Sequence, residues 1–153
     1  MNNLFLVTGS SGFIGSHVSD ILTDKGHKVI LFDKKTSKYK KKNQKMLLGD
    51  INDQKDLNKA TKNVHTVFHF AAKADLIEAN KEPFDAIENN IEGTVKIFKA
   101  SLKNNVKKIV FASSIYARSE QGGIYSTSKL AAEMILERPV SYTHLRAHET
   151  DSY

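Results

Sequence analysis

The sequence predicts an α/β fold, namely a doubly wound parallel sheet of about five strands in the order 3-2-1-4-5. Apolar runs typical of buried strands alternate along the chain with segments whose apolar residues recur every three or four positions, which is a helical pattern. The first apolar run stops at a glycine-rich loop, residues 8–15, which leads directly into such a helical pattern. Repeated strand–loop–helix units of this kind form parallel sheets, so each element can be placed in turn.

Two strands and the helix between them are expected near the N-terminus. Residues 4–8 form an apolar run that suits a strand buried on both faces, and residues 28–33 form a second such run. The helix between them should end near Gly26, because helical spacing persists up to that point in the apolar residues Phe13, Ile14, Val18, Ile21 and Leu22.

The next elements continue the alternation. A lysine-rich loop leads to a short third strand around residues 46–48. Asp53 can cap a helix that runs to about Lys62, and residues 64–70 follow as the fourth strand.

A long helix and a final strand–helix pair complete the predicted domain. Pro83 marks the start of the long helix, which should end near residues 104–105, and its apolar positions are Phe84, Ile87, Ile91, Val95 and Phe98. Residues 108–112 form the expected fifth strand. After residues 122–123, both glycines, the last helix has the apolar positions Leu130, Ala131, Met134 and Ile135.

The composition suits one folded domain. The chain has 153 residues and 40% hydrophobic content, enough to bury a core. It has no cysteine, which excludes disulfides and thiolate metal sites and is compatible with the reducing cytoplasm, where we expect the protein to act. The N-terminus lacks the features of a secretory signal, and no apolar run reaches transmembrane length, so we expect no membrane partner. We also expect no bound metal.

The formal net charge of +6 is concentrated in one segment. Twelve consecutive residues contain Lys34, Lys35, Lys38, Lys40, Lys41, Lys42 and Lys45. Such a run could contact the phosphates of a nucleic acid or of a cofactor, but no aromatic platform or nucleic-acid motif accompanies it. We therefore predict a solvated loop and no nucleic-acid partner.

Residues 139–153 are expected to be foreign to the native protein. Residues 140–150 resemble, residue for residue, one reading frame of a transposon-end adapter used to prepare sequencing libraries. That frame requires Ser, Pro, Thr or Ala at the preceding position, which is Pro139. We therefore predict a domain of residues 1–138. No role is assigned to His144 and His148, although their four-residue spacing could place two imidazoles on one helix face for a metal.

The glycine loop is suited to the pyrophosphate of a dinucleotide. Gly9 permits a tight bend, Gly12 lets the backbone approach phosphate, and Gly15 lets the helix pack close to the strand. The N–H groups of the following helix favour the same anion. The predicted binding set also includes Ser11, Phe13 and Ile14, and a plain glycine turn is the alternative.

The adenosine half of the cofactor is expected at two later strand ends. Asp33 ends the second strand, 24 residues beyond Gly9, where a carboxylate can accept hydrogen bonds from both ribose hydroxyls. This favours NAD, because the carboxylate would repel the 2′-phosphate of NADP, although the two lysines that follow could partly offset the repulsion. A turn-forming role for Asp33 is the alternative. Asp50 and Ile51, after the third strand, are expected to bracket the adenine.

Tyr125 and Lys129 are the candidates for the chemistry. On a helix, a four-residue step places both side chains on one face, where the ammonium can lower the pKa of the phenol. Such a phenol could take a proton from a sugar hydroxyl, whereas the structural alternative has Tyr125 packed on the sheet and Lys129 solvated. His69, inside an apolar strand, is expected to be a core imidazole without a catalytic role. Asn90 could hold a helix bend or face water.

Seven motifs follow one another along the chain, namely TGSSGFIG (8–15), Asp33, GDI (49–51), VFHFAA (67–72), NIEGT (90–94), FASS (111–114) and YSTSK (125–129). In this order they resemble the extended short-chain dehydrogenase/reductases of the NAD-dependent epimerase/dehydratase family, and among them the nucleotide-sugar enzymes such as UDP-glucose 4-epimerases. The resemblance covers almost all of residues 1–138.

The resemblance implies a role for each site residue. Tyr125 would be the acid/base, Lys129 would lower its pKa and hold the nicotinamide ribose, and Ser114 would hydrogen-bond the reacting oxygen. Ser113 is the alternative serine. In an epimerase of this family, the tyrosine takes a hydroxyl proton as hydride leaves the same carbon for NAD, and the ketone then receives the hydride on its other face. The strand end that approaches the nicotinamide would comprise Phe70, Ala71 and Ala72.

The resemblance also implies that the chain is truncated after the tyrosine helix. Members of the family are commonly longer and build their nucleotide-sugar pocket largely from the part that would follow. We expect the cofactor half of an epimerase-like enzyme, inactive alone, with a sheet incomplete at its C-terminal edge. The intact parent would take a nucleotide sugar and could form a homodimer. The alternatives are a sugar dehydratase or reductase, a non-catalytic dinucleotide sensor, and a nucleic-acid binder acting through the lysine loop.

Overall fold

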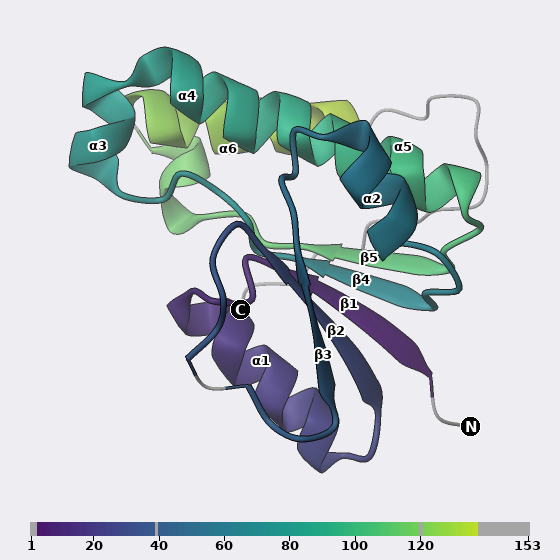
Figure 1. Cartoon of the computed structure of the whole chain (residues 1–153). Helices are drawn as coiled ribbons and strands as arrows, with labels where there is room; N and C mark the ends of the chain where they lie inside the picture. The colour runs from purple at the N-terminus through teal and green to yellow at the C-terminus, as the bar shows by residue number, and fades with distance from the viewer. Residues whose placement is uncertain (1–2, 39, 120, 138–153) are drawn as a thin grey trace.

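The computed structural model of the protein describes residues 3–38, 40–119 and 121–137 (Figure 1). The expected foreign segment, residues 139–153, lies outside the described residues. The described strands form one parallel sheet in the order β3-β2-β1-β4-β5, which confirms the predicted topology. They are β1 (Leu4–Thr8), β2 (Lys28–Asp33), β3 (Gln44–Leu48), β4 (Thr66–His69) and β5 (Lys108–Phe111).

Helices cover the two faces of this sheet unequally (Figure 1). One face carries α1 (Phe13–Asp24), and the other carries α2 (Gln54–Ala60), α5 (Gly93–Lys103) and α6 (Gly123–Glu137). Two short helices, α3 (Leu76–Lys81) and α4 (Pro83–Ile87), pack against α6. A π turn, η1 (Glu88–Glu92), joins α4 to α5, and a 3₁₀ turn, η2 (Ile115–Arg118), precedes α6.

Several predicted ends are explained by backbone geometry. Gly26 has a φ of +83°, its N–H donates to the Thr23 carbonyl, and the N–H of His27 donates to the Leu22 carbonyl. This pair of bonds is a Schellman motif, which ends α1 near the predicted glycine. Asp53 accepts from the N–H groups of the second and third residues after it and so caps α2, as predicted.

The core consists of two layers, one on each face of the sheet. Between the sheet and α2 and α5, the fully buried side chains include Leu6, Phe32, Leu57, Ile97 and Ile109. On the α1 face, Val7, Val29 and Leu31 pack with the half-buried side chains of Leu22 and Phe68. Burial of each large aliphatic side chain contributes about 2 kcal/mol, so these two layers fix the strand order and the positions of the strand ends.

The buried face of α1 differs from its apolar stripe. Phe13, Ile14 and Ile21 are exposed by 81%, 56% and 55%, whereas the fully buried positions are Gly15 and Ser19. These two small residues let α1 approach the sheet closely, and a large side chain would hold the helix away. Helical spacing therefore located the helix but identified only part of the side that packs, because Leu22 packs on the sheet and the three exposed residues do not.

The long helix predicted from Pro83 is interrupted at η1. Its buried positions are Ala86 before the π turn, Asn90 within it, and Thr94, Ile97 and Ala100 after it. A π turn contains one residue more than an α turn, which changes the face that points inward. Asn90 lies within this π turn and is buried, so the alternative in which it faces water is wrong.

Two elements were not expected from the sequence, namely α3 and η2. The third strand also begins two residues earlier than predicted, at Gln44. Within the part of the chain that the structure describes, no helix is long and apolar enough to cross a membrane.

Candidate functional site

A cavity of about 560 Å³ lies where the carboxyl ends of β1, β2 and β4 meet. The glycine loop lines it on one side and Tyr125 and Lys129 line it on another, so residues from opposite ends of the described chain share one site. The predicted site residues among its lining are Gly9, Ser11, Gly12, Phe13, Ile14, Gly15, Asp33, Ile51, Phe70, Ala71, Ala72, Tyr125 and Lys129.

Two predicted site residues, Asp50 and Ser114, are not among the lining residues. Asp50 forms an ion pair with Lys34 at a distance of 3.1 Å between Nζ and Oδ2. Eight residues that we had not assigned to the site also line the cavity, and all but Asn89 lie within two positions of an assigned residue, so closeness in sequence could have indicated them. They are Phe32, Lys34, Lys35, Gly49, Ala74, Asn89, Ala112 and Ser113, the last being our alternative serine.

The glycine loop is packed so closely that side chains would not fit at two of its positions. Gly9 has a φ of +67°, and a Cβ there would lie 2.6 Å from the backbone nitrogen of Ala71. A Cβ on Gly15 would overlap the carbonyl oxygen of Gly9. Gly12 is exposed to the cavity immediately before α1 begins, so backbone N–H groups at this helix end can approach an anion.

Asp33 joins the glycine loop to the start of the lysine loop. Its Oδ2 accepts a hydrogen bond from the N–H of Ser11 and its Oδ1 accepts one from the N–H of Lys35, both at 3.0 Å. The Ser11 hydroxyl also donates to the Lys35 carbonyl at 2.6 Å. A carboxylate has about four acceptor positions, so Asp33 can organise the turn and still accept from ribose hydroxyls.

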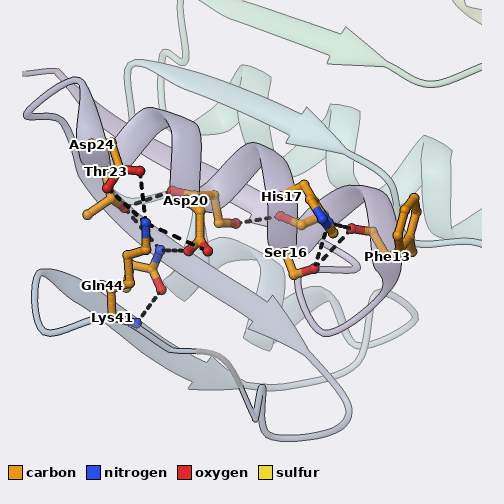
Figure 2. Close-up of polar contacts among 10 residues, drawn as sticks. Phe13, Ser16, His17, Asp20, Thr23, Asp24, Lys41 and Gln44 are labelled. Carbon is orange, nitrogen blue, oxygen red and sulfur yellow. Dashed lines mark hydrogen bonds and ion pairs between the residues drawn. The ribbon is translucent and has the colours of Figure 1, made fainter.

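Part of the lysine loop folds back on the last turns of α1 (Figure 2). The Lys41 ammonium donates to Asp24 Oδ1 at 2.8 Å, and this bond raises the pKa of Lys41. The buried Gln44 donates to Asp20 at 2.8 Å and to Thr23 at 3.1 Å, and its Oε1 accepts from the N–H of Lys41. Acidic residues of α1 therefore offset part of the positive charge.

Lys129 is the most buried ammonium at the site, with 4% of the residue exposed. Burial lowers its pKa to about 8, and Glu133, one helical turn away, acts in the opposite direction. Its Nζ lies 4.5 Å from the ring centre of Phe111 on β5, which provides a cation–π contact. Tyr125 precedes Lys129 by four residues on α6, and both line the cavity, as the helical spacing predicted.

His69 is fully buried between two threonines. Its Nδ1 lies 2.6 Å from the Thr8 hydroxyl and its Nε2 lies 3.1 Å from the Thr94 hydroxyl. Because Thr94 donates its own proton to the Asn90 carbonyl at 2.7 Å, Nε2 carries the imidazole proton and Nδ1 accepts from Thr8. Burial, assisted by the charge of Lys129, lowers the pKa of His69 to about 3. The imidazole is neutral and structural, as expected.

Asn90 connects the wall of the cavity to α6. Its Oδ1 accepts from the N–H of Lys73 at 2.7 Å, and its Nδ2 donates to the Lys73 carbonyl at 3.1 Å and to the Ser128 hydroxyl at 2.9 Å. Ser128 precedes Lys129. The π turn therefore holds the segment after β4 against the helix that carries the tyrosine and the lysine.

The two candidate serines have different surroundings. Ser113 is exposed and lines the cavity. Ser114 caps η2 by accepting a hydrogen bond from the N–H of Tyr116 at 3.2 Å. That bond uses a lone pair of Ser114 and leaves its hydroxyl proton available to donate.

Among the residues described, no group of three or more His, Cys, Asp or Glu side chains is placed to hold a metal ion. His144 and His148 lie outside them.

The sequence matches the model of the NAD dependent epimerase/dehydratase family over residues 5–146. The chain belongs to this family. It is 39% identical over 113 residues to the UDP-glucose 4-epimerase of Halalkalibacterium halodurans, and the match covers 71% of this chain and 34% of that protein. It is 36% identical over 126 residues to the bifunctional protein GAL10 of Candida maltosa, covering 74% of this chain and 82% of that sequence.

Solved structures of similar proteins agree with this membership in the epimerase/dehydratase family. The structure of MoeE5 in complex with UDP-glucose and NAD superimposes with a TM-score of 0.82 at 27% sequence identity. The superposition covers 94% of this chain and 52% of that one. The chain thus spans about half of this structure and about a third of the Halalkalibacterium enzyme.

Proposed function

We propose that the chain binds NAD and forms the cofactor half of a nucleotide-sugar epimerase, most similar to UDP-glucose 4-epimerases. The observation that carries this proposal is the single cavity lined by the glycine loop, Asp33 and the Tyr125–Lys129 pair. A cofactor cradle and an acid/base pair that share one cavity suit an enzyme whose dinucleotide receives hydride from a bound sugar. If residues 8–15 were only a glycine turn, nothing would require the Tyr125–Lys129 pair to line the same cavity.

The residues present fit NAD. Gly12 and the first turn of α1 would hold the pyrophosphate, because Gly12 has no side chain, lines the cavity and precedes the first N–H groups of the helix. Asp33 would accept from the adenosine ribose hydroxyls. Lys34 is paired with Asp50, which reduces its capacity to balance a 2′-phosphate, so NAD is favoured over NADP.

NAD would supply the hydride acceptor, and the protein would handle the proton. Tyr125 would take the proton from the sugar hydroxyl that is oxidised and return it when the ketone is reduced. Lys129, as an ammonium that lines the same cavity, would bind the nicotinamide ribose and stabilise negative charge on the Tyr125 oxygen during the proton transfer. Ser114 would donate its free hydroxyl proton to the reacting oxygen, and Ser113, which lines the cavity, is the alternative donor.

The substrate and the assembly belong to the intact parent in this proposal. The parent would bind a nucleotide sugar largely through residues beyond the tyrosine helix, so the 153 residues alone should not turn over sugars. The parent would act in the cytoplasm, with which a chain without cysteine is compatible. A homodimer of the parent would use the exposed apolar side chains on α5 and α6, namely Val95, Met134 and Ile135.

Titration calorimetry with NAD and NADP tests the cofactor assignment. NAD should bind with measurable heat and NADP more weakly. Asp33→Asn should reduce NAD affinity about tenfold, since a charged acceptor of hydroxyl hydrogen bonds contributes about 1.5 kcal/mol. Asp24→Asn, at the far end of α1, is the matched control and should bind NAD as the unaltered chain does. Equal affinity in the Asp33 and Asp24 variants would contradict the assignment.

An epimerase assay tests the fragment assignment separately. UDP-glucose and NAD incubated with the 153-residue chain should give no UDP-galactose above the level of the Tyr125→Phe variant. Turnover that depends on Tyr125 would show that the substrate site is contained in this chain.

A further inference from the structure

Among the residues that the structure describes, no side chain next to the start of α6 caps its first turn. The first N–H groups of a helix lack partners within it, and a Ser, Thr, Asp or Asn side chain at its start usually accepts from them. Here Gly122 and Gly123 stand at the start, with φ of +106° and +54°. The N–H of Ile124 donates instead to Oδ1 of Asn80, on α3, at 3.1 Å.

Asn80 and Gly123 fit each other sterically. A Cβ on Gly123 would overlap Oδ1 of Asn80 and lie 2.9 Å from its Cγ. Two separate reasons therefore favour glycine at position 123. Its φ is left-handed, and the Asn80 carboxamide occupies the space that a side chain would need. The cap supplied by α3 depends on the absence of a side chain on α6.

Helix α3 connects this cap to the wall of the cavity. Ala74 lines the cavity, and the next residue, Asp75, caps α3 by accepting from the N–H groups of Ile77 and Glu78 at 2.9 Å each. Ala79 is fully buried and anchors α3 in the interior. A continuous path thus leads from the cavity wall through α3 and Asn80 to the turn that carries Tyr125.

We propose that Asn80 is a positioning residue that caps α6 from outside and holds Tyr125 at the cavity. This role rests on the proposed function, in which Tyr125 is the acid/base and NAD occupies the cavity. Ala74 and Tyr125 both line the cavity, so bound NAD would restrain both ends of the path. Bound cofactor should therefore slow hydrogen exchange in the first turn of α6, and Asn80 should be required for the full effect.

Amide hydrogen exchange followed by NMR on the 153-residue chain tests the cap. Asn80→Ala removes the acceptor and raises the helix propensity of α3, so faster exchange in α6 would not come from poorer intrinsic helicity in α3. The Ile124 amide should exchange about fivefold faster, as expected for a lost cap, while β1 amides keep their rates. Asn80→Asp can accept the same bond and should restore slow exchange. Lys81→Ala, the adjacent exposed position, is the matched control.

A second variant and the cofactor separate the remaining outcomes. Gly123→Ala would displace the Asn80 carboxamide and also strain the backbone at a φ of +54°, so Ile124 exchange should become faster; unchanged exchange there would count against the cap even if Asn80→Ala fails to fold. Unchanged Ile124 exchange in either folded variant would overturn the role of Asn80. If NAD slows exchange in the glycine loop and equally in α6 of both Asn80→Ala and the unaltered chain, the cap does not position Tyr125. If NAD slows exchange nowhere in the glycine loop, the proposed cofactor function fails. The Ile124 exchange rates measured without NAD then decide whether Asn80 caps α6.

Discussion

The two sides of the cavity are built by different kinds of contact. On the glycine-loop side, the backbone itself forms the wall, with the Gly12 N–H donating to the Gly9 carbonyl and the Ser16 N–H donating to the Gly12 carbonyl. On the tyrosine-helix side, side chains from distant elements hold α6, namely Asn80 from α3 and Asn90 from η1. One wall depends on the absence of side chains and the other on particular side chains.

This difference explains how each side responds to change. In the glycine loop, added atoms meet backbone atoms that cannot move independently of β1 and β4. Around α6, a lost side chain removes a hydrogen bond that water can partly replace at exposed positions. We therefore expect substitutions to have larger effects in the glycine loop than at the contacts that hold α6.

The largest effect is expected for Gly15→Ala. The new methyl group would overlap the Gly9 carbonyl oxygen, and overpacking against backbone should destabilise the fold by about 3 kcal/mol and abolish NAD binding. Gly26→Ala is the matched control, because no atom lies within 4 Å of its added Cβ and only its φ of +83° costs free energy, about 1 kcal/mol. Urea unfolding and calorimetry measure both quantities. Equal losses in the two variants would show that close packing at Gly15 is unimportant.

Acid should destabilise the tyrosine-helix side through His69. The pKa of His69 is about 3 in the folded protein, against an ordinary value of 6.5. Between pH 3 and pH 6.5 the unfolded chain therefore binds more protons than the folded one. The contribution of His69 to the free energy of unfolding is fully present above pH 6.5 and falls by about 1.4 kcal/mol per pH unit as the pH drops toward 3. His69→Gln should be less stable at pH 7 and should lose less stability between pH 7 and pH 5. The free energy of unfolding is measured with urea at each pH, and an equal loss in the two proteins between pH 7 and pH 5 would contradict this prediction.

A smaller effect is expected for Gln44→Ala, which breaks the contacts between the start of β3 and α1. Gln44 is buried, but its partner Asp20 reaches solvent, so the loss should be about 1 kcal/mol in urea unfolding. NAD affinity should not change, because the cavity lies at the other end of α1. Lys45→Ala, the next and exposed residue, should be neutral, and a drop in NAD affinity for Gln44→Ala would show that the two ends of α1 are coupled.

The smallest effect is expected for Lys41→Ala. Its ion pairs with Asp24 and Asp20 are exposed, so the variant should melt only slightly below the unaltered chain. The difference should vanish at high salt, which screens such pairs. A difference in melting temperature that persists in 1 M salt would indicate that Lys41 acts through packing.

The sequence predicted local features and the general topology. The Gly26 helix end, the Asp53 cap and the glycine loop follow from patterns within a few positions, and the structure confirms them. The strand order follows from the alternation of strands and helices along the chain, and it is confirmed as well. The sequence did not predict α3 or η2, which are short and lack clear periodicity. The cap from Asn80 could not be predicted, because it joins residues 44 positions apart through a bond that leaves no local pattern.

The roles of the two serines show the same limit. Both Ser113 and Ser114 follow β5, and the resemblance favoured Ser114, with Ser113 as the alternative. The structure places Ser113 in the lining, and it shows that the hydroxyl of Ser114 is oriented by η2, an element that the sequence did not reveal.

The π turn also sets how the long helix tolerates changes in length. Deleting one residue from η1 would restore an ordinary α-helical path and leave α5 close to its present orientation relative to α4, because the π turn holds one residue more than an α turn. A deletion inside α5 would instead rotate every residue after it by about 100°, and Ile97 and Ala100 would leave the sheet. The fold should therefore tolerate a deletion in η1 better than one in α5.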